Sequence, residues 1–146
     1  MDNTQTKAPW HLWLVGVVAV LFNSIGVFDF VMSRAQGAAY LASAGMTKAQ
    51  VAYYLEMPAW MTVVWAVGVF GAFLASLMLL LRSARAFPVF VLSLVAFLVS
   101  LLYTHVLTDG GAIMGRSMAI TSAVIAVLLV LFSSYAWIMT TRRVLR

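Results

Sequence analysis

The chain of 146 residues contains no cysteine and only four acidic residues. Without cysteine it has no disulfide, no thiol nucleophile and no cysteine-ligated metal. It also lacks a phosphate-binding loop, the H-E-x-x-H motif and any Ser-His-Asp order typical of hydrolases. We therefore predict no catalytic site, no metal and no cofactor.

Charge is scarce as well, at 9% of the residues, where a soluble domain carries about 25%. Hydrophobic residues make up 64% and the mean hydropathy is +1.03. A chain of this length leaves roughly a third of its unfolded surface exposed, so this much apolar surface is expected to face the lipid bilayer. The nine basic residues stand at the ends of apolar runs, which predicts membrane topology and not nucleic-acid binding.

Four apolar stretches have the roughly 20 residues that cross the hydrocarbon core of a bilayer. They are His11–Met32, Trp60–Leu81, Phe87–Leu107 and Ser117–Met139. The first is too long for the apolar part of a signal peptide, which has about 7–15 residues. The sequence predicts a single all-α domain over residues 1–146, a four-helix transmembrane bundle.

The basic residues also predict the orientation. If four spans alternate, six fall on one side: Lys7, Arg82, Arg85, Arg142, Arg143 and Arg146. Three fall on the other: Arg34, Lys48 and Arg116. The positive-inside rule places the first side, with both termini, in the cytoplasm. Of the acids, Asp2 then lies inside, and Asp29, Glu56 and Asp109 lie outside.

The connection Ser33–Ala59 is the only long segment between spans. Thr47 is a good N-cap residue for a short helix from Lys48 to Glu56. Val51, Tyr54 and Leu55 recur at i, i+3 and i+4, which gives this helix one apolar face. We predict an interfacial helix over residues 47–56 that lies across the outer mouth of the bundle. Packing on a partner protein is the alternative.

Small residues recur inside the spans at helix-packing spacing, which favours one compact bundle because close approach holds membrane helices together. The rows are Gly16, Ala19, Asn23 and Gly26 in the first span; Gly68, Ala72 and Ser76, beside Gly71 and Ala75, in the second; Ser93, Ala96 and Ser100 in the third; and Ala119, Ser122 or Ala123, Ala126 and Ser133 in the fourth.

Polar residues in or near the spans are candidates for a substrate or ion path, because they are costly in lipid. Asn23 lies in the middle of the first span, and Asp29 lies near its outer end. Glu56, Tyr103, His105 and Asp109 are expected at the same outer level. His105 and Asp109 are four residues apart and would meet on one face if the helix continues that far.

Each of these candidates also has a structural interpretation. Asn23 would form an interhelical hydrogen bond, which in membranes contributes about 0.6 kcal/mol on average. The outer acids would cap helices and pair with Arg34 and Arg116. One histidine with carboxylates is a weak metal-binding set, and no metal site is assigned to it.

Four short motifs suggest a relationship: P-W-H-L-W at Pro9–Trp13, N-x-x-G-x-F-D at Asn23–Asp29, M-P-A-W at Met57–Trp60 and L-T-D-G at Leu107–Gly110. Taken together, the chain resembles a family of small four-helix bacterial inner-membrane proteins, mostly uncharacterised and sometimes labelled sugar transporters. The resemblance implies an inner-membrane location and small-solute transport, for which a chain of four spans is expected to form a homodimer or a larger assembly. The alternative is a non-catalytic accessory or scaffold subunit of a larger membrane complex.

Overall fold

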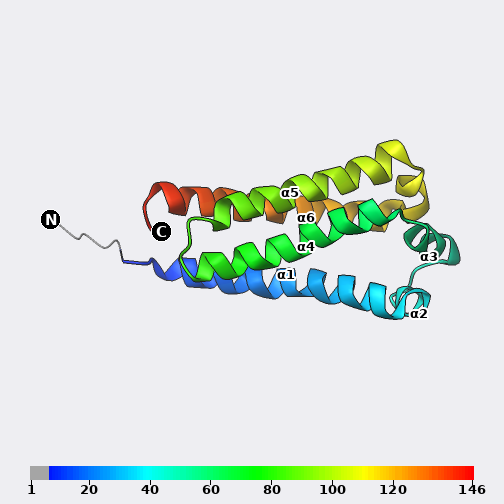
Figure 1. Cartoon of the computed structure of the whole chain (residues 1–146), viewed down its shortest axis with the longest axis horizontal. Coiled ribbons are helices and arrows are strands. Elements are labelled where there is room, and N and C mark those ends of the chain that lie inside the picture. The colour runs from blue at the N-terminus through cyan, green and yellow to red at the C-terminus, as the bar shows by residue number, and fades with distance from the viewer. Residues whose placement is uncertain (1–6) are drawn as a thin grey trace.

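The computed structural model describes residues 7–146, so Asp2 and its predicted cytoplasmic position lie outside the described residues. In order, the elements are α1 (Trp10–Gln36), α2 (Ala38–Ser43), α3 (Lys48–Leu55), α4 (Ala59–Leu80), α5 (Ala86–Leu102), the π-helical turn η1 (Tyr103–Leu107) and α6 (Gly110–Thr141). The described residues form helices, turns and connections without a strand, which confirms the all-α prediction. Within residues 7–146, four helices are long and apolar enough to cross a membrane: α1, α4, α5 with η1, and α6. Figure 1 shows them side by side.

Glycines set two boundaries that the apolar runs do not mark. Helix α1 continues past the predicted end at Met32 and stops before Gly37, whose φ of 54° and ψ of −127° separate it from α2. Inside α6, Gly115 has a φ of 74° and a ψ of −177°, which breaks the helix. Glycine adopts such angles at little cost. The membrane-spanning part of α6 therefore begins at Arg116, close to the predicted Ser117.

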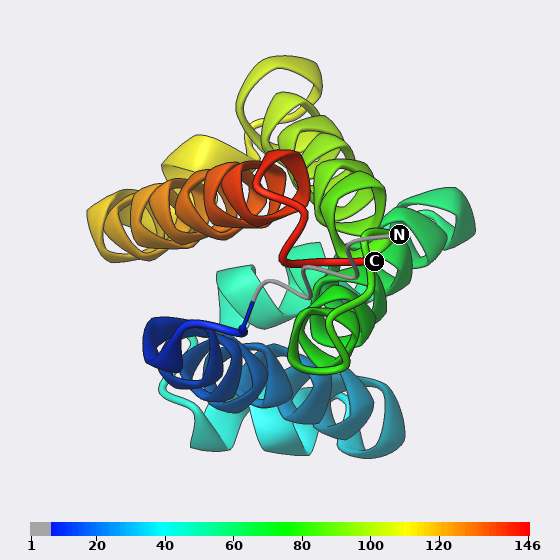
Figure 2. The same cartoon turned by 90° about the vertical axis from the view of Figure 1, so that its left-hand side faces the viewer.

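The helices pack in the order of the chain, with α1 on α4, α4 on α5 and α5 on α6. Along most of their length α1 and α6 stay apart, as the end-on view in Figure 2 shows. They meet through aromatic side chains: the His11 Nδ1 lies 2.6 Å from the Tyr135 hydroxyl, and the Phe22 and Phe132 rings are 6.5 Å apart. The bundle is thus an open row of helices whose two outer members touch at a few rings.

Helix α4 packs closely on both of its neighbours, because a glycine lies at each of the two interfaces. On one side, a Cβ added at Gly16 of α1 would overlap the Leu80 side chain. On the other side, a Cβ added at Gly71 would lie 2.5 Å from the Ser93 Oγ of α5. Ala72, Ala75 and Ser76 between these contacts are buried. The small-residue rows predicted in the first three spans thus lie at the α1–α4 and α4–α5 interfaces.

The two ends of the bundle carry different residues. Both ends of the described chain and the α4–α5 turn lie at one end, and α2 and α3 lie at the other (Figure 1). The first end therefore holds Lys7 and the five arginines Arg82, Arg85, Arg142, Arg143 and Arg146. The opposite end holds Arg34, Lys48 and Arg116 together with the three described acids. We call the first the basic end and the second the α3 end.

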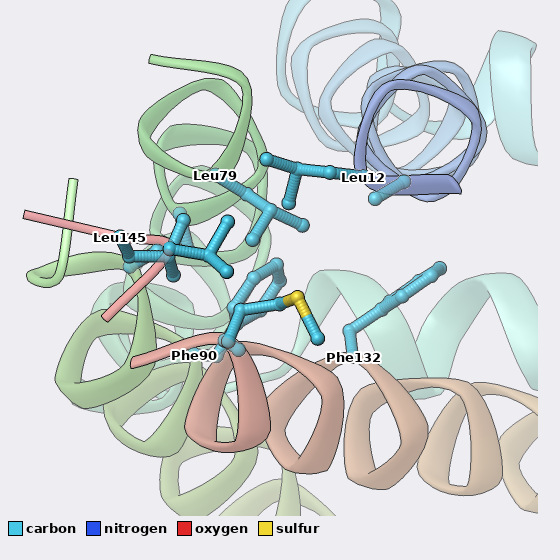
Figure 3. Close-up of a cluster of buried hydrophobic side chains, with 11 residues drawn as sticks. Leu12, Leu79, Phe90, Phe132 and Leu145 are labelled. Atoms are coloured by element: carbon cyan, nitrogen blue, oxygen red, sulfur yellow. The ribbon is translucent and has the colours of Figure 1, made fainter. Parts of the chain in front are cut away.

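The main hydrophobic core lies toward the basic end. Leu12, Leu79 and Phe90 are fully buried there, and the Phe90 and Phe132 rings stack with centroids 6.0 Å apart (Figure 3). The segment after α6 returns into this core, where Leu145 is 4% exposed. The last residues of the chain thus contribute to the packing of the bundle.

Replacement of Leu145 by alanine should lower the free energy of unfolding by about 2 kcal/mol, because it leaves a cavity in this core. The matched control is Leu131→Ala in α6, where the side chain is 56% exposed and the expected change is below about 0.5 kcal/mol. Unfolding in mixed detergent micelles measures both values. Equal losses of unfolding free energy in the two variants would show that the segment after α6, called the tail below, does not belong to the core.

Candidate functional site

Asn23 is buried at the α1–α4 interface, and its amide nitrogen donates two hydrogen bonds. The Nδ2 donates to the Ala19 carbonyl oxygen and to the Ser76 Oγ, both at 2.9 Å. Ser76 in turn donates to the Ala72 carbonyl oxygen at 2.7 Å. Both N–H groups of the amide are therefore used. This geometry favours the interhelical hydrogen bond over contact with a transported solute.

Asp29 lies near the α3 end of α1 and contacts the neighbouring short helix. Its Oδ1 accepts a hydrogen bond from the Tyr40 hydroxyl of α2 at 2.9 Å. The next residue, Phe30, packs edge-on against Trp65 of α4 with centroids 4.8 Å apart, and Tyr54 of α3 lies 5.8 Å from the same indole. We call these five residues the Asp29 cluster. It joins α1, α2, α3 and α4.

The surroundings of the Asp29 cluster raise the pKa values of its two tyrosines. Burial raises the pKa of Tyr54 to about 12, and the negative charge of Asp29 and the neighbouring Tyr53 add to the rise. The pKa of Tyr40 is raised chiefly by its hydrogen bond to Asp29, then by burial and by the Asp29 charge. Both hydroxyls thus remain protonated donors at neutral pH. The cluster is thus an assembly of hydrogen-bonded and aromatic side chains that joins the short helices to the bundle.

His105 and Asp109 do not share a helix face. The helix ends at Leu107, Thr108 is extended with a φ of −139°, and Asp109 precedes α6. The expected i, i+4 arrangement is therefore absent. The His105 Nδ1 instead lies 3.1 Å from the Leu101 carbonyl oxygen. A Cβ added at Gly111 would lie 2.9 Å from the His105 ring, so the imidazole packs on the glycine backbone.

The remaining outer candidates have separate surroundings. Glu56 ends α3 and is exposed, as are His105 and Asp109. Tyr103 packs edge-on against Trp60, with ring centroids 5.4 Å apart. Within residues 7–146 no three His, Asp or Glu side chains gather closely enough to hold a metal ion. The six candidate path residues thus contact several different neighbours, and their assignment to a path stays a prediction.

Helix α3 docks through residues that the candidate set omits. The Gln50 Nε2 donates to the carbonyl oxygens of Ile113 and Met114, at 3.3 and 3.1 Å. The Tyr53 hydroxyl lies 2.8 Å from the Thr108 Oγ1. Thr47 and Gln50 also form a capping box, whose T-x-x-Q spacing is visible in the sequence. Nothing local to the sequence identifies the partners of Gln50 and Tyr53, which lie 55–64 residues away.

The apolar face predicted for α3 is only partly used. The helix runs from Lys48 to Leu55, one residue shorter than predicted, and none of its side chains is fully buried. Leu55 is 51% exposed, whereas Val51 and Tyr54 are half-buried. Polar contacts with Thr108 and with the first residues of α6 therefore hold α3 at this end of the bundle.

Helix α6 differs from the other spans in what it exposes. Between residues 13 and 31 of α1, 60 and 74 of α4, and 92 and 102 of α5, every exposed side chain is large and apolar. Helix α6 exposes Ser117, Ala119, Thr121 and Ala123 among its large residues. Of the small-residue row predicted for this span, Ser133 is buried, and Ala119 and Ala123 are exposed. We call residues 117–126 the α6 seam.

A groove of about 490 Å³ runs beside this seam. Leu98, Leu102 and His105 line it from α5 and η1, and Ala119, Ser122 and Ala123 line it from α6. Arg116 stands one helical turn before Ala119 and so lies on the same face, at the α3 end of the groove. The groove is apolar along its length, with a histidine and an arginine near one end.

Comparison with protein-family models, with curated proteins and with solved structures finds no match to this chain. The resemblance to small bacterial inner-membrane proteins therefore stays a prediction.

The hydrogen bond between Asn23 and Ser76 predicts a coupling energy of about 0.6 kcal/mol in a double-mutant cycle of Asn23→Ala and Ser76→Ala. The matched control is Ser24→Ala with Ser76→Ala, because the Ser24 Oγ donates to the Val20 carbonyl oxygen of its own helix. That control cycle should give no coupling. Unfolding free energies in detergent supply both cycles. Equal coupling in the two would contradict a specific Asn23–Ser76 contact.

Replacement of Asp29 by asparagine should shift tyrosine ionisation to lower pH. Removing the negative charge makes the tyrosinate forms of Tyr40 and Tyr54 less costly, so the pKa of each falls. Asp109→Asn is the matched control, because Asp109 contributes to neither shift. Ultraviolet absorbance of tyrosinate between pH 9 and 12.5, roughly spanning the normal and raised values, measures the effect. An equal shift in both variants would contradict the Asp29 cluster.

Proposed function

We propose that this chain is a non-catalytic accessory subunit that packs against a transmembrane helix of another membrane protein through the α6 seam. The observation that carries the proposal is the difference between the spans. Helices α1, α4 and α5 expose large apolar side chains along the lengths given above, whereas α6 exposes small residues beside a groove. In the first three spans no residue of the small-residue rows is exposed, whereas Ala119 and Ala123 of the α6 row are exposed.

The physics of membrane helices supports a helix as the occupant. Apolar side chains gain little free energy by leaving lipid, so helices associate where small residues let backbones approach and van der Waals contacts form. Ala119 and Ala123 follow the small-xxx-small spacing that allows such an approach. A lipid chain needs no such spacing.

Charge favours a different protein over a second copy of this chain. Arg116 lies on the face of the seam, one turn from Ala119. If α6 packed parallel on α6 of a second copy about a two-fold axis, the two Arg116 side chains would lie at the same level and repel each other. A partner helix with an acidic residue at that level would form a pair instead. We therefore infer a partner helix with small residues along one face and an acid at the α3 end.

The proposed location is the plasma membrane of a bacterium, with the basic end and both termini in the cytoplasm. The six basic residues at that end, against three at the other, support this orientation. The bacterial location rests on the family resemblance. Solute transport is the other hypothesis, and it too rests on that resemblance. The contacts of Asn23 and Asp29 do not favour it, because their side chains are hydrogen-bonded to Ser76 and Tyr40.

The absence of cysteine allows a clean test of the α6 seam. A photo-reactive maleimide on Ala123→Cys should give one discrete adduct with a second protein in native membranes. The matched control is Leu74→Cys on α4, which is 48% exposed among other large side chains and should give none. Mass spectrometry should identify a transmembrane helix with small residues and an acid at the expected level.

A second substitution makes the result specific. Adding Ala119→Leu to the Ala123→Cys chain should lower the adduct yield by about tenfold, because a bulky residue in the seam costs about 1–3 kcal/mol of packing. Gel mobility with two different epitope tags shows whether the adduct contains two copies of this chain. An adduct of two copies, or equal yields at residues 74 and 123, would overturn the proposal.

A further inference from the structure

At the basic end, the tail after α6 is hydrogen-bonded to the α4–α5 turn. The Arg146 N–H donates to the Arg82 carbonyl oxygen, and the Ala84 N–H donates to the Arg146 carbonyl oxygen, both at 2.7 Å. The Arg82 Nε and Nη2 both donate to the Val144 carbonyl oxygen at 3.1 Å. Burial of Val144 and Leu145 in the core anchors this segment. The tail is therefore a fixed part of the fold.

Two arginines stand at this end in a backbone conformation that favours glycine. Arg82 has a φ of 58° and Arg143 a φ of 54°. Each follows a helix at the position where glycine is the usual residue, and the Ser83 and Val144 N–H groups close the two turns by bonding back to Met78 and Met139. A side chain with a Cβ is strained at this φ. The chain thus keeps a cationic side chain at two positions where glycine would be less costly.

A pocket of about 230 Å³ opens at the same place. Its lining is Leu81, Arg82, Ser83 and Arg146. Leu81 is 80% exposed at the end of α4, and Phe87 and Trp137 pack together nearby at the same end, with ring centroids 5.0 Å apart. Aromatic rings at span ends are typical of the headgroup level of a bilayer. The pocket therefore combines cations, a hydroxyl and an apolar wall at the height of lipid headgroups.

The sign of the local charge selects the class of ligand. Arg146 lines the pocket, and Arg85 and Arg142 are exposed at the same end of the bundle. The acidic side chains among residues 7–146, Asp29, Glu56 and Asp109, all belong to the α3 end. Guanidinium groups match the geometry of phosphate oxygens and bind them in pairs of hydrogen bonds. Basic pockets at this level of a membrane protein favour anionic headgroups.

We propose that the pocket formed by Leu81, Arg82, Ser83 and Arg146 binds the phosphate of an anionic phospholipid. Arg146 and Ser83 face the phosphate oxygens, Arg82 adds positive charge while the Val144 carbonyl oxygen holds it in place, and Leu81 contacts the upper part of an acyl chain. A zwitterionic lipid fits less well because its own cation approaches the surrounding arginines. The site is separate from the α6 seam and does not depend on the proposed partner.

Native mass spectrometry of the delipidated full chain with equal amounts of phosphatidylglycerol and phosphatidylcholine tests this site. The wild type should retain phosphatidylglycerol preferentially. Arg146→Gln should reduce that retention by about fivefold, the effect expected for one arginine near an anionic lipid. The matched control is Arg34→Gln, which removes one exposed charge at the α3 end and should leave retention unchanged. Equal losses in both variants, or no preference in the wild type, would overturn the proposal.

Two further measurements separate the alternatives. Arg146→Lys keeps the charge, so it should retain more phosphatidylglycerol than Arg146→Gln and less than the wild type. If Arg146→Gln does not fold, Arg146→Lys serves as the test variant. Inorganic phosphate, added at the concentration of the lipid, should not displace phosphatidylglycerol. Displacement by inorganic phosphate would show a site for free anions and would contradict a lipid site.

Discussion

In a bilayer, helices hold together where their backbones approach closely, because apolar side chains gain little by leaving lipid. Helix α4 meets this requirement on two sides. Gly16 of α1 approaches the Leu80 side chain, and Gly71 approaches Ser93 of α5. The buried hydrogen bond from Asn23 to Ser76 lies on the first of these interfaces. The rest of the molecule is arranged around this central helix, with α6 added on the far side of α5.

This arrangement explains why the two outer helices differ. The small residues of helix α1 pack on α4, and its exposed residues are large. In the first half of α6, by contrast, Ser117, Ala119 and Ala123 are exposed. Because α1 and α6 meet through a few rings only, neither covers the other's outer face. The α6 seam is thus a consequence of packing the helices as an open row, and it supports assembly with another helix more directly than a path through the bundle.

Polar contacts within one helical turn can be predicted from the sequence, whereas those between distant segments cannot. The sequence correctly predicts the short helix at Lys48–Leu55, since Thr47 and Gln50 cap it within one turn. It does not predict that Asp29 bonds to Tyr40, because the bond depends on the reversal at Gly37. The contact between His105 and Asp109 is expected only if the helix continues to Asp109. The helix ends at Leu107, and a four-residue spacing brings side chains together only inside a continuous helix.

The sequence alone determines the four apolar helices, their approximate ends and the excess of basic residues at one end, because hydropathy, span length and charge are properties of single segments. The tertiary structure decides which polar groups meet, that the α6 seam stays exposed, and that the tail returns to the α4–α5 turn with Arg146 beside Arg82. The physical reason is that a membrane helix is apolar on nearly all sides. Hydropathy therefore does not fix its rotation or its neighbours, which are set by the fit of small and large side chains between segments far apart in the chain.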